Sequence, residues 1–142
     1  MNTPVSFEIA KLLKEKDFDE RCNHGYWFNK KNPTLLNNAT YANSQHQIYD
    51  GRRILALAPT IADVVMWLHE KHGIWISVFF VLQHKAWDYS YTNINWTEEE
   101  NSKELKQELD NIINNLFRPT VKKNSPTEAY LEAIKYTLTD LI

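Results

Sequence analysis

The stretch that most constrains the fold runs from residue 58 to Gly73 and continues directly into residues 74–82. Thr60 and Asp63 resemble a capping box, with Asp in the place usually taken by Glu or Gln, and Gly73 suits the left-handed end of a helix. We therefore predict an amphipathic helix between them. The strand that follows is apolar on both faces, which is typical of a central strand with layers above and below it. This segment predicts a helix–sheet–helix arrangement.

The same segment predicts which side chains are inside. Five helix residues share one apolar face: Ile61, Val64, Val65, Leu68 and His72. Successive strand residues point to opposite faces, so Ile76 and Phe79 point in opposite directions. Because both faces of the strand are apolar, we expect both of these side chains to be buried.

Capping signals predict three further helices. The first begins at Thr3 or Ser6 and ends near Asp17. The second begins at Thr97 and carries an apolar stripe of Leu105, Leu109, Ile112, Ile113 and Leu116. The third begins at Ser125, where serine, proline and a glutamate three residues on form a full capping box.

The remaining elements are predicted to be strands and loops. Residues 26–28 are compatible with a short strand, and residues 54–58 have the length and apolar character of another. We expect the rest of residues 19–52 to be mainly loop, ordered by its aromatic side chains. A four-residue connection at 83–86 leads to a strand with Trp87, Tyr89 and Tyr91 on one face and Asp88, Ser90 and Thr92 on the other. One side of that strand should be wet.

Length and composition bound the class of protein. The 142 residues suit one domain, residues 1–142. The order of elements predicts the α+β class, with a small mixed or antiparallel sheet and helices on both faces, similar to an α-β-α sandwich. Cys22 is the only cysteine and no signal peptide is apparent, so we expect a reducing, cytoplasmic setting. The longest apolar run, residues 74–82, is shorter than the roughly twenty residues of a membrane helix, so no membrane partner is expected.

Five motifs spread over most of the chain resemble a family of small uncharacterised phage and prophage proteins of Bacteroidetes-type bacteria. They are Phe-Asp-Glu-Arg-Cys at 18–22 with Tyr26 after it, Ala-Pro-Thr at 58–60, Trp-Leu-His-Glu-Lys-His-Gly at 67–73, Trp-Asp-Tyr at 87–89 and Ser-Pro-Thr-Glu-Ala-Tyr at 125–130. Family members often carry Pro where this chain has Arg21, and residues 97–123 are longer than usual. The resemblance, which extends loosely to phage α-β-α sandwich proteins, implies a fold and a mobile-element origin. It implies no activity and no functional residues.

Three histidines are candidate metal ligands, because zinc favours imidazole nitrogens. His69 and His72 are three residues apart, whereas the metalloprotease helix needs a spacing of four, and His84 lies beyond the strand. Histidines in the last turn of a helix also interact favourably with its dipole. We therefore favour a structural role for them and predict no metal and no cofactor.

Other catalytic chemistry has little support in the sequence. Cys22 and His24 are two residues apart in a predicted loop, which is not a geometry that activates a thiol. The three carboxylates at 98–100 are explained by favourable charge at a helix start. The three glycines are isolated, so no phosphate-binding loop is present. We expect a protein that is not an enzyme.

The charge balance bears on the partner. Acidic residues outnumber basic ones by 18 to 16, and the basic pairs at 30–31, 52–53 and 122–123 are scattered, whereas double-stranded-RNA-binding modules need a concentrated basic face. From the resemblance and the lack of catalytic motifs, we expect a non-catalytic phage or prophage accessory protein that acts by protein–protein contact. A nucleic-acid-binding module of helix–strand–strand–helix type is the alternative. The candidate interaction surface consists of four aromatic residues: Tyr26, Trp27, Tyr41 and Trp87. An exposed apolar patch favours the first interpretation and a continuous basic face the second.

Overall fold

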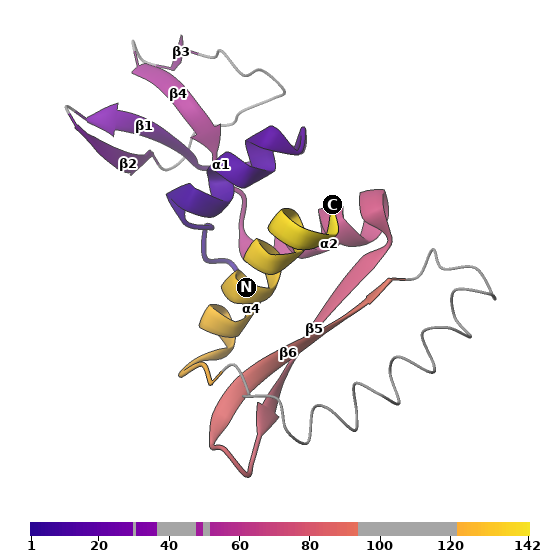
Figure 1. Ribbon diagram of the computed structural model, residues 1–142. Coiled ribbons are helices and arrows are strands. Elements are labelled where there is room, and N and C mark those ends of the chain that lie inside the picture. Colours follow the sequence, from indigo (N-terminus) through magenta and orange to yellow (C-terminus); the bar gives the residue numbers. More distant parts are fainter. Residues whose placement is uncertain (30, 37–47, 50–51, 94–121) are drawn as a thin grey trace.

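The computed structural model describes residues 1–29, 31–36, 48–49, 52–93 and 122–142 (Figure 1). The helices are α1 (Phe7–Glu15), α2 (Ile61–His72) and α4 (Pro126–Tyr136), and a π-helical turn, η1 (Thr137–Leu141), continues α4. The strands are β1 (Gly25–Asn29), β2 (Asn32–Leu36), β3 (Ile48–Tyr49), β4 (Arg52–Leu57), β5 (Ile74–Val81) and β6 (Ala86–Asn93). The α+β class is confirmed. The helix predicted from Thr97 lies outside the described residues.

The strands form two small antiparallel sheets instead of one. The first has the order β2-β1-β4-β3, and the second is the β5–β6 hairpin. The helices lie together between the two sheets: α1 contacts β4, α2 contacts β5, and α4 contacts both strands of the hairpin (Figure 1). The largest fully buried side chains come from these helices and the inner face of β5, and include Leu13, Ile61, Leu68, Ile76, Ile134 and Leu138.

Local signals place the helix ends as the sequence predicts. The Asp63 N–H donates to the Thr60 hydroxyl at 3.3 Å, and the Asp63 carboxylate accepts from the Thr60 N–H at 2.9 Å, which completes the capping box. Gly73 ends α2 with a φ of 67°, a conformation that costs glycine little. Ser6 caps α1 and Ser125 caps α4, each accepting from an N–H in the first turn. The predicted helix starts at Ser6, Thr60 and Ser125 and the helix end at Gly73 are confirmed. The full capping box predicted at Ser125 is not confirmed, because the Glu128 carboxylate accepts from the Asn124 N–H instead of the Ser125 N–H.

The prediction that residues 74–82 form a central strand buried on both faces is wrong. Within the described part of the chain β5 pairs with β6 alone. Ile74 and Ile76 are buried against the helices, but Trp75 is 43% exposed and Phe79 44% exposed. Apolar side chains on both faces cannot reveal whether a second layer is present. Within the described structure, α2 and α4 cover only one face of the β5–β6 hairpin.

The region of residues 19–52 contains more strand than the sequence predicts. The strand at 26–28 is confirmed as β1, whereas β2 and β3 were not expected. Pro33 is a turn signal in the sequence, but it lies in β2 at the edge of the sheet, where a missing N–H is tolerated. A register shift between Tyr26 and Trp27 leaves Leu55 of β4 without a partner on β1.

Candidate functional site

Exposed apolar side chains gather on the β5–β6 hairpin. Among the described residues, the exposed large hydrophobic side chains of the hairpin are Trp75, Phe79, Phe80, Leu82 and Tyr91, with Phe80 47% and Leu82 78% exposed. We call these five residues the hairpin surface. Several exposed large apolar side chains on one element commonly mark a site of interaction.

The hairpin surface has two parts that the strand register defines. Trp75 and Phe79 lie opposite Thr92 and Asp88, on the face turned away from the helices. Phe80 lies opposite Trp87, on the same side of the hairpin as Ile74 and Ile76 and close to the turn. The turn end of the hairpin extends past the start of α4 (Figure 1). Phe79 and Phe80 are therefore exposed on opposite faces near the turn, whereas Trp75 lies at the other end of the hairpin.

Trp75 is held in position by a neighbouring ring. The His69 imidazole, in the last turn of α2, meets the Trp75 indole edge to face, with centroids 5.2 Å apart and planes at 82°. His69 Nδ1 is buried and has no hydrogen-bond partner among the described residues. The contact restricts the indole before any partner arrives, which lowers the entropic cost of binding.

The turn end of the hairpin is fixed to the body of the protein. The Phe80 and Trp87 rings make an edge-to-face contact at 5.4 Å. Trp87 also exchanges two backbone hydrogen bonds with Lys123, of 3.0 and 3.2 Å. The β6 strand is thus anchored to the segment that leads into α4, and the exposed Phe80 packs on an anchored residue.

The four aromatic residues predicted as an interaction surface do not form one surface. Tyr26 is half-buried, donates from its hydroxyl to the Val5 carbonyl at 2.9 Å, and has its pKa raised by burial. Trp27 lies on the opposite face of β1 and packs against Ile54. Trp87 is in the other sheet, next to the hairpin surface, and Tyr41 lies outside the described residues. The exposed Phe79 and Phe80 were missed because burial was predicted for their strand.

The structure does not bring the three histidines together. His69 contacts Trp75, whereas the His72 ring contacts Trp67 at 4.7 Å, and His84 lies in the hairpin turn. Burial and the nearby Lys16 charge lower the pKa of His72. Within the described ranges there is no group of three or more His, Cys, Asp or Glu side chains that could hold a metal ion.

Cys22 lies in an environment that keeps it protonated. The side chain is buried, and burial together with the Asp63 charge raises the pKa of its thiol to about 12. A nucleophilic cysteine needs the opposite shift. The His24 carbonyl accepts a hydrogen bond from the Ala58 N–H at 2.9 Å, which makes this part of the chain a structural junction with the end of β4. The carboxylates at residues 98–100 lie outside the described residues.

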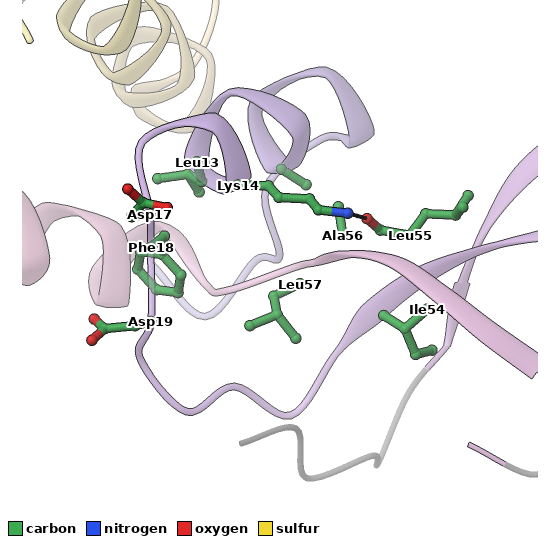
Figure 2. A pocket seen from close by; sticks show the side chains of 10 residues that line it. Leu13, Lys14, Asp17, Phe18, Asp19, Ile54, Leu55, Ala56 and Leu57 are labelled. Atoms are coloured by element: carbon green, nitrogen blue, oxygen red, sulfur yellow. Dashed lines mark hydrogen bonds between the residues drawn. The ribbon is translucent and has the colours of Figure 1, made fainter. Parts of the chain in front are cut away.

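A cleft of about 320 Å³ lies between α1 and β4. Leu13, Phe18, Ala56 and Leu57 are among its apolar walls. Figure 2 shows Lys14 reaching across the cleft, where its ammonium donates to the Leu55 carbonyl at 2.9 Å.

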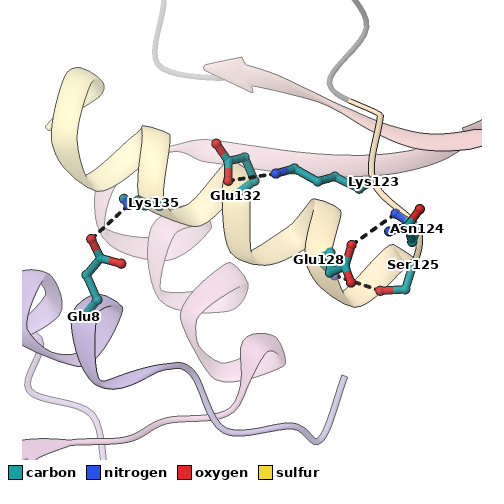
Figure 3. A network of polar contacts seen from close by, with 7 residues as sticks. All are labelled: Glu8, Lys123, Asn124, Ser125, Glu128, Glu132 and Lys135. Carbon is teal, nitrogen blue, oxygen red and sulfur yellow. Dashed lines mark hydrogen bonds and ion pairs between the residues drawn. The ribbon is translucent and has the colours of Figure 1, made fainter.

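A polar network joins α1 to α4 (Figure 3). Lys135 pairs with Glu8 of α1 at 2.8 Å, which raises the lysine pKa, and Lys123 pairs with Glu132 at 3.2 Å. Glu128 accepts from the Asn124 N–H at 3.1 Å, one residue before the position its capping box predicts. Exposed pairs of this kind contribute little to stability. Of these contacts, the Lys135–Glu8 pair is the one that links α4 to α1.

None of the helices in the described part of the chain has the length and apolar character needed to cross a lipid bilayer. Comparison with protein-family models, curated proteins and solved structures found no match.

Proposed function

We propose that the protein is a non-catalytic accessory protein of a phage or prophage that acts in the cytoplasm by binding another protein. The observation that carries the binding proposal is the hairpin surface. The phage origin is supported by the resemblance in the sequence, and the cytoplasmic setting by the single cysteine.

The hairpin surface has the composition of a binding site. Aromatic anchors dominate the energy of protein interfaces, and tryptophan is prominent among them. Trp75 and Phe79 are four residues apart on the same face of β5, with the polar Ser77 between them. A partner with an apolar groove would bury both rings and leave Thr92 and Asp88 as part of a polar rim.

The basic pairs give less support to nucleic acid as the partner. In the pair at 122–123, Lys122 is exposed, but Lys123 is already paired with Glu132. A phosphate-binding face requires several free cations on one side. The protein partner is therefore the better proposal.

The test compares the wild type with the double variant Trp75→Thr, Phe79→Thr in affinity capture from infected host lysate, with and without nuclease. Threonine suits a strand and is polar, so the variant should fold. Met66→Thr is the matched control, because Met66 is exposed and apolar but lies on α2.

We expect a protein that the wild type and Met66→Thr both capture, with nuclease present, and that the double variant loses. The same capture by the double variant contradicts the proposal. Capture that nuclease abolishes supports the nucleic-acid alternative. Binding of a hydrophobic dye gives a second readout, which the double variant should reduce and the control should not.

A further inference from the structure

We propose that the cleft between α1 and β4 binds an extended basic peptide segment of a partner, which pairs with the outer edge of β4. This site is separate from the hairpin surface and does not depend on the function proposed for it. Three observations carry the proposal: a strand edge with no described partner strand, an apolar cleft, and two carboxylates with no ion pair among the described residues.

Among the described residues, no strand pairs with the outer edge of β4 in its second half. β3 pairs only with Arg52 and Arg53. The Ala58 N–H donates to the His24 carbonyl, so the next pair along the ladder, Gly25 and Leu57, is of the non-hydrogen-bonded type. The peptide groups of Leu57 therefore point away from β1, toward the side on which Lys14 bonds the Leu55 carbonyl. A lysine ammonium thus supplies a donor where a neighbouring strand would supply an N–H.

The cleft beside this edge offers room for side chains. Its volume of about 320 Å³ is at the lower end of the range for ligand sites. Leu13, Phe18 and Ala56 are buried and form apolar walls, with Leu57 facing Phe18 (Figure 2). Peptides that add a strand to a sheet edge gain affinity from main-chain bonds and specificity from such side-chain pockets.

The charge at the end of the cleft favours a basic partner. Asp17 and Asp19 line the cleft next to Phe18, both are exposed, and neither forms an ion pair with a described residue. Two nearby lysines already have partners: Lys14 bonds the Leu55 carbonyl and Lys16 bonds the Ile142 carbonyl. A lysine or arginine of the bound segment would find two carboxylates with which to form charge-assisted hydrogen bonds.

Asp17 also occupies a costly conformation. It follows the end of α1 with a φ of 56°, where glycine is the usual residue. Asp17→Gly should therefore keep or raise the stability of the protein, while it removes a carboxylate from the cleft. A gain in stability together with a loss of binding would separate a binding role from a structural one.

The probe is a blocked hexapeptide of alternating valine and arginine, with a valine–glutamate hexapeptide as its control. We expect the first to bind with a Kd below about 1 mM, measured by calorimetry, and the second not to bind. The double variant Asp17→Asn, Asp19→Asn should weaken binding at least fivefold. Asp140→Asn, a change at an exposed carboxylate on η1, should not.

Hydrogen exchange locates the bound peptide. Binding should slow exchange of the Leu57 amide, and Leu57→Pro, which removes that outward N–H, should abolish binding. The Trp75→Thr, Phe79→Thr variant should bind the peptide normally, which separates this site from the hairpin surface. No binding by the valine–arginine peptide, equal loss with Asp140→Asn, or unchanged Leu57 exchange on binding would each overturn the proposal.

Discussion

The imidazole of His69 and the indole of Trp75 meet edge to face across the junction between α2 and β5, with centroids 5.2 Å apart. His69 lies in the last turn of α2, and Trp75 lies near the start of β5 on its exposed face. In this position the His69 Nδ1 atom is buried and has no hydrogen-bond partner among the described residues. An unsatisfied buried polar group costs about 1–3 kcal/mol.

His69→Phe should therefore stabilise the protein. Phenylalanine keeps an aromatic edge against Trp75 and removes the unsatisfied nitrogen, so we expect the free energy of unfolding to rise by about 1 kcal/mol. Urea denaturation followed by circular dichroism measures the change. His69→Ala, which removes both the nitrogen and the ring contact, is the comparison. A His69→Phe variant less stable than the wild type would show that the nitrogen is satisfied in solution.

The two faces of β5 should respond differently to the same charge. Ile76→Asp buries a carboxylate in the core and should unfold the protein, because an unpaired buried charge costs several kcal/mol. Phe79→Asp places the carboxylate on the exposed face and should lower the melting temperature by no more than a few degrees. Thermal melts of both variants provide the measurement. Equal loss of structure in the two would mean that the Phe79 face is covered in solution.

The contrast between these faces shows where the sequence falls short. The ends of α2 were predictable, because Thr60, Asp63 and Gly73 act through contacts within a few residues. The exposure of Trp75 and Phe79 depends on how many strands and layers surround β5, which is a property of the whole fold. A signal was nevertheless present, since the wet face predicted for β6 pairs in register with these residues.

The cleft was beyond prediction for a different reason. The cleft lies where α1 packs on β4, beside Leu55, which the register shift leaves without a partner on β1. This shift lies between β1 and β4, two strands far apart along the chain, so no local sequence pattern predicts it. Lys14, Asp17 and Asp19 are read in the sequence as ordinary charges at the end of a helix, and only the packing of α1 on β4 places them at a cleft.

The Cys22 thiol should make stability fall at alkaline pH. Its pKa in the folded protein is about 12, against 9.0 when unperturbed, so the unfolded chain ionises first. The stabilisation is complete below pH 9 and is lost as the pH rises from 9 towards 12, by about 1 kcal/mol per pH unit. Cys22→Ala should lack this component when urea denaturation is repeated between pH 8 and pH 11. Parallel curves for the two proteins would contradict the raised pKa.

The same burial should make Cys22 unreactive. At pH 8 a thiol reagent should modify the native protein at least a hundredfold more slowly than the urea-unfolded chain, because the thiolate is the reactive form. Absorbance during modification with an aromatic disulfide measures the rate. Fast modification of the native protein would contradict this prediction and support a functional role for the Cys22 thiol.

His72 should give stability the opposite dependence, at acidic pH. Burial and the Lys16 charge lower its pKa below 6.5, so in this range the unfolded chain binds a proton more readily than the folded protein. The contribution of His72 is complete above pH 6.5 and is lost as the pH falls through the lowered pKa. His72→Gln cannot titrate and should lose less stability than the wild type between pH 7 and pH 5, in urea denaturation at constant ionic strength. Lys16→Met should raise the pKa of His72, measured by NMR titration of its ring protons, because it removes the neighbouring positive charge. An unchanged pKa in Lys16→Met would leave burial as the sole cause of the shift.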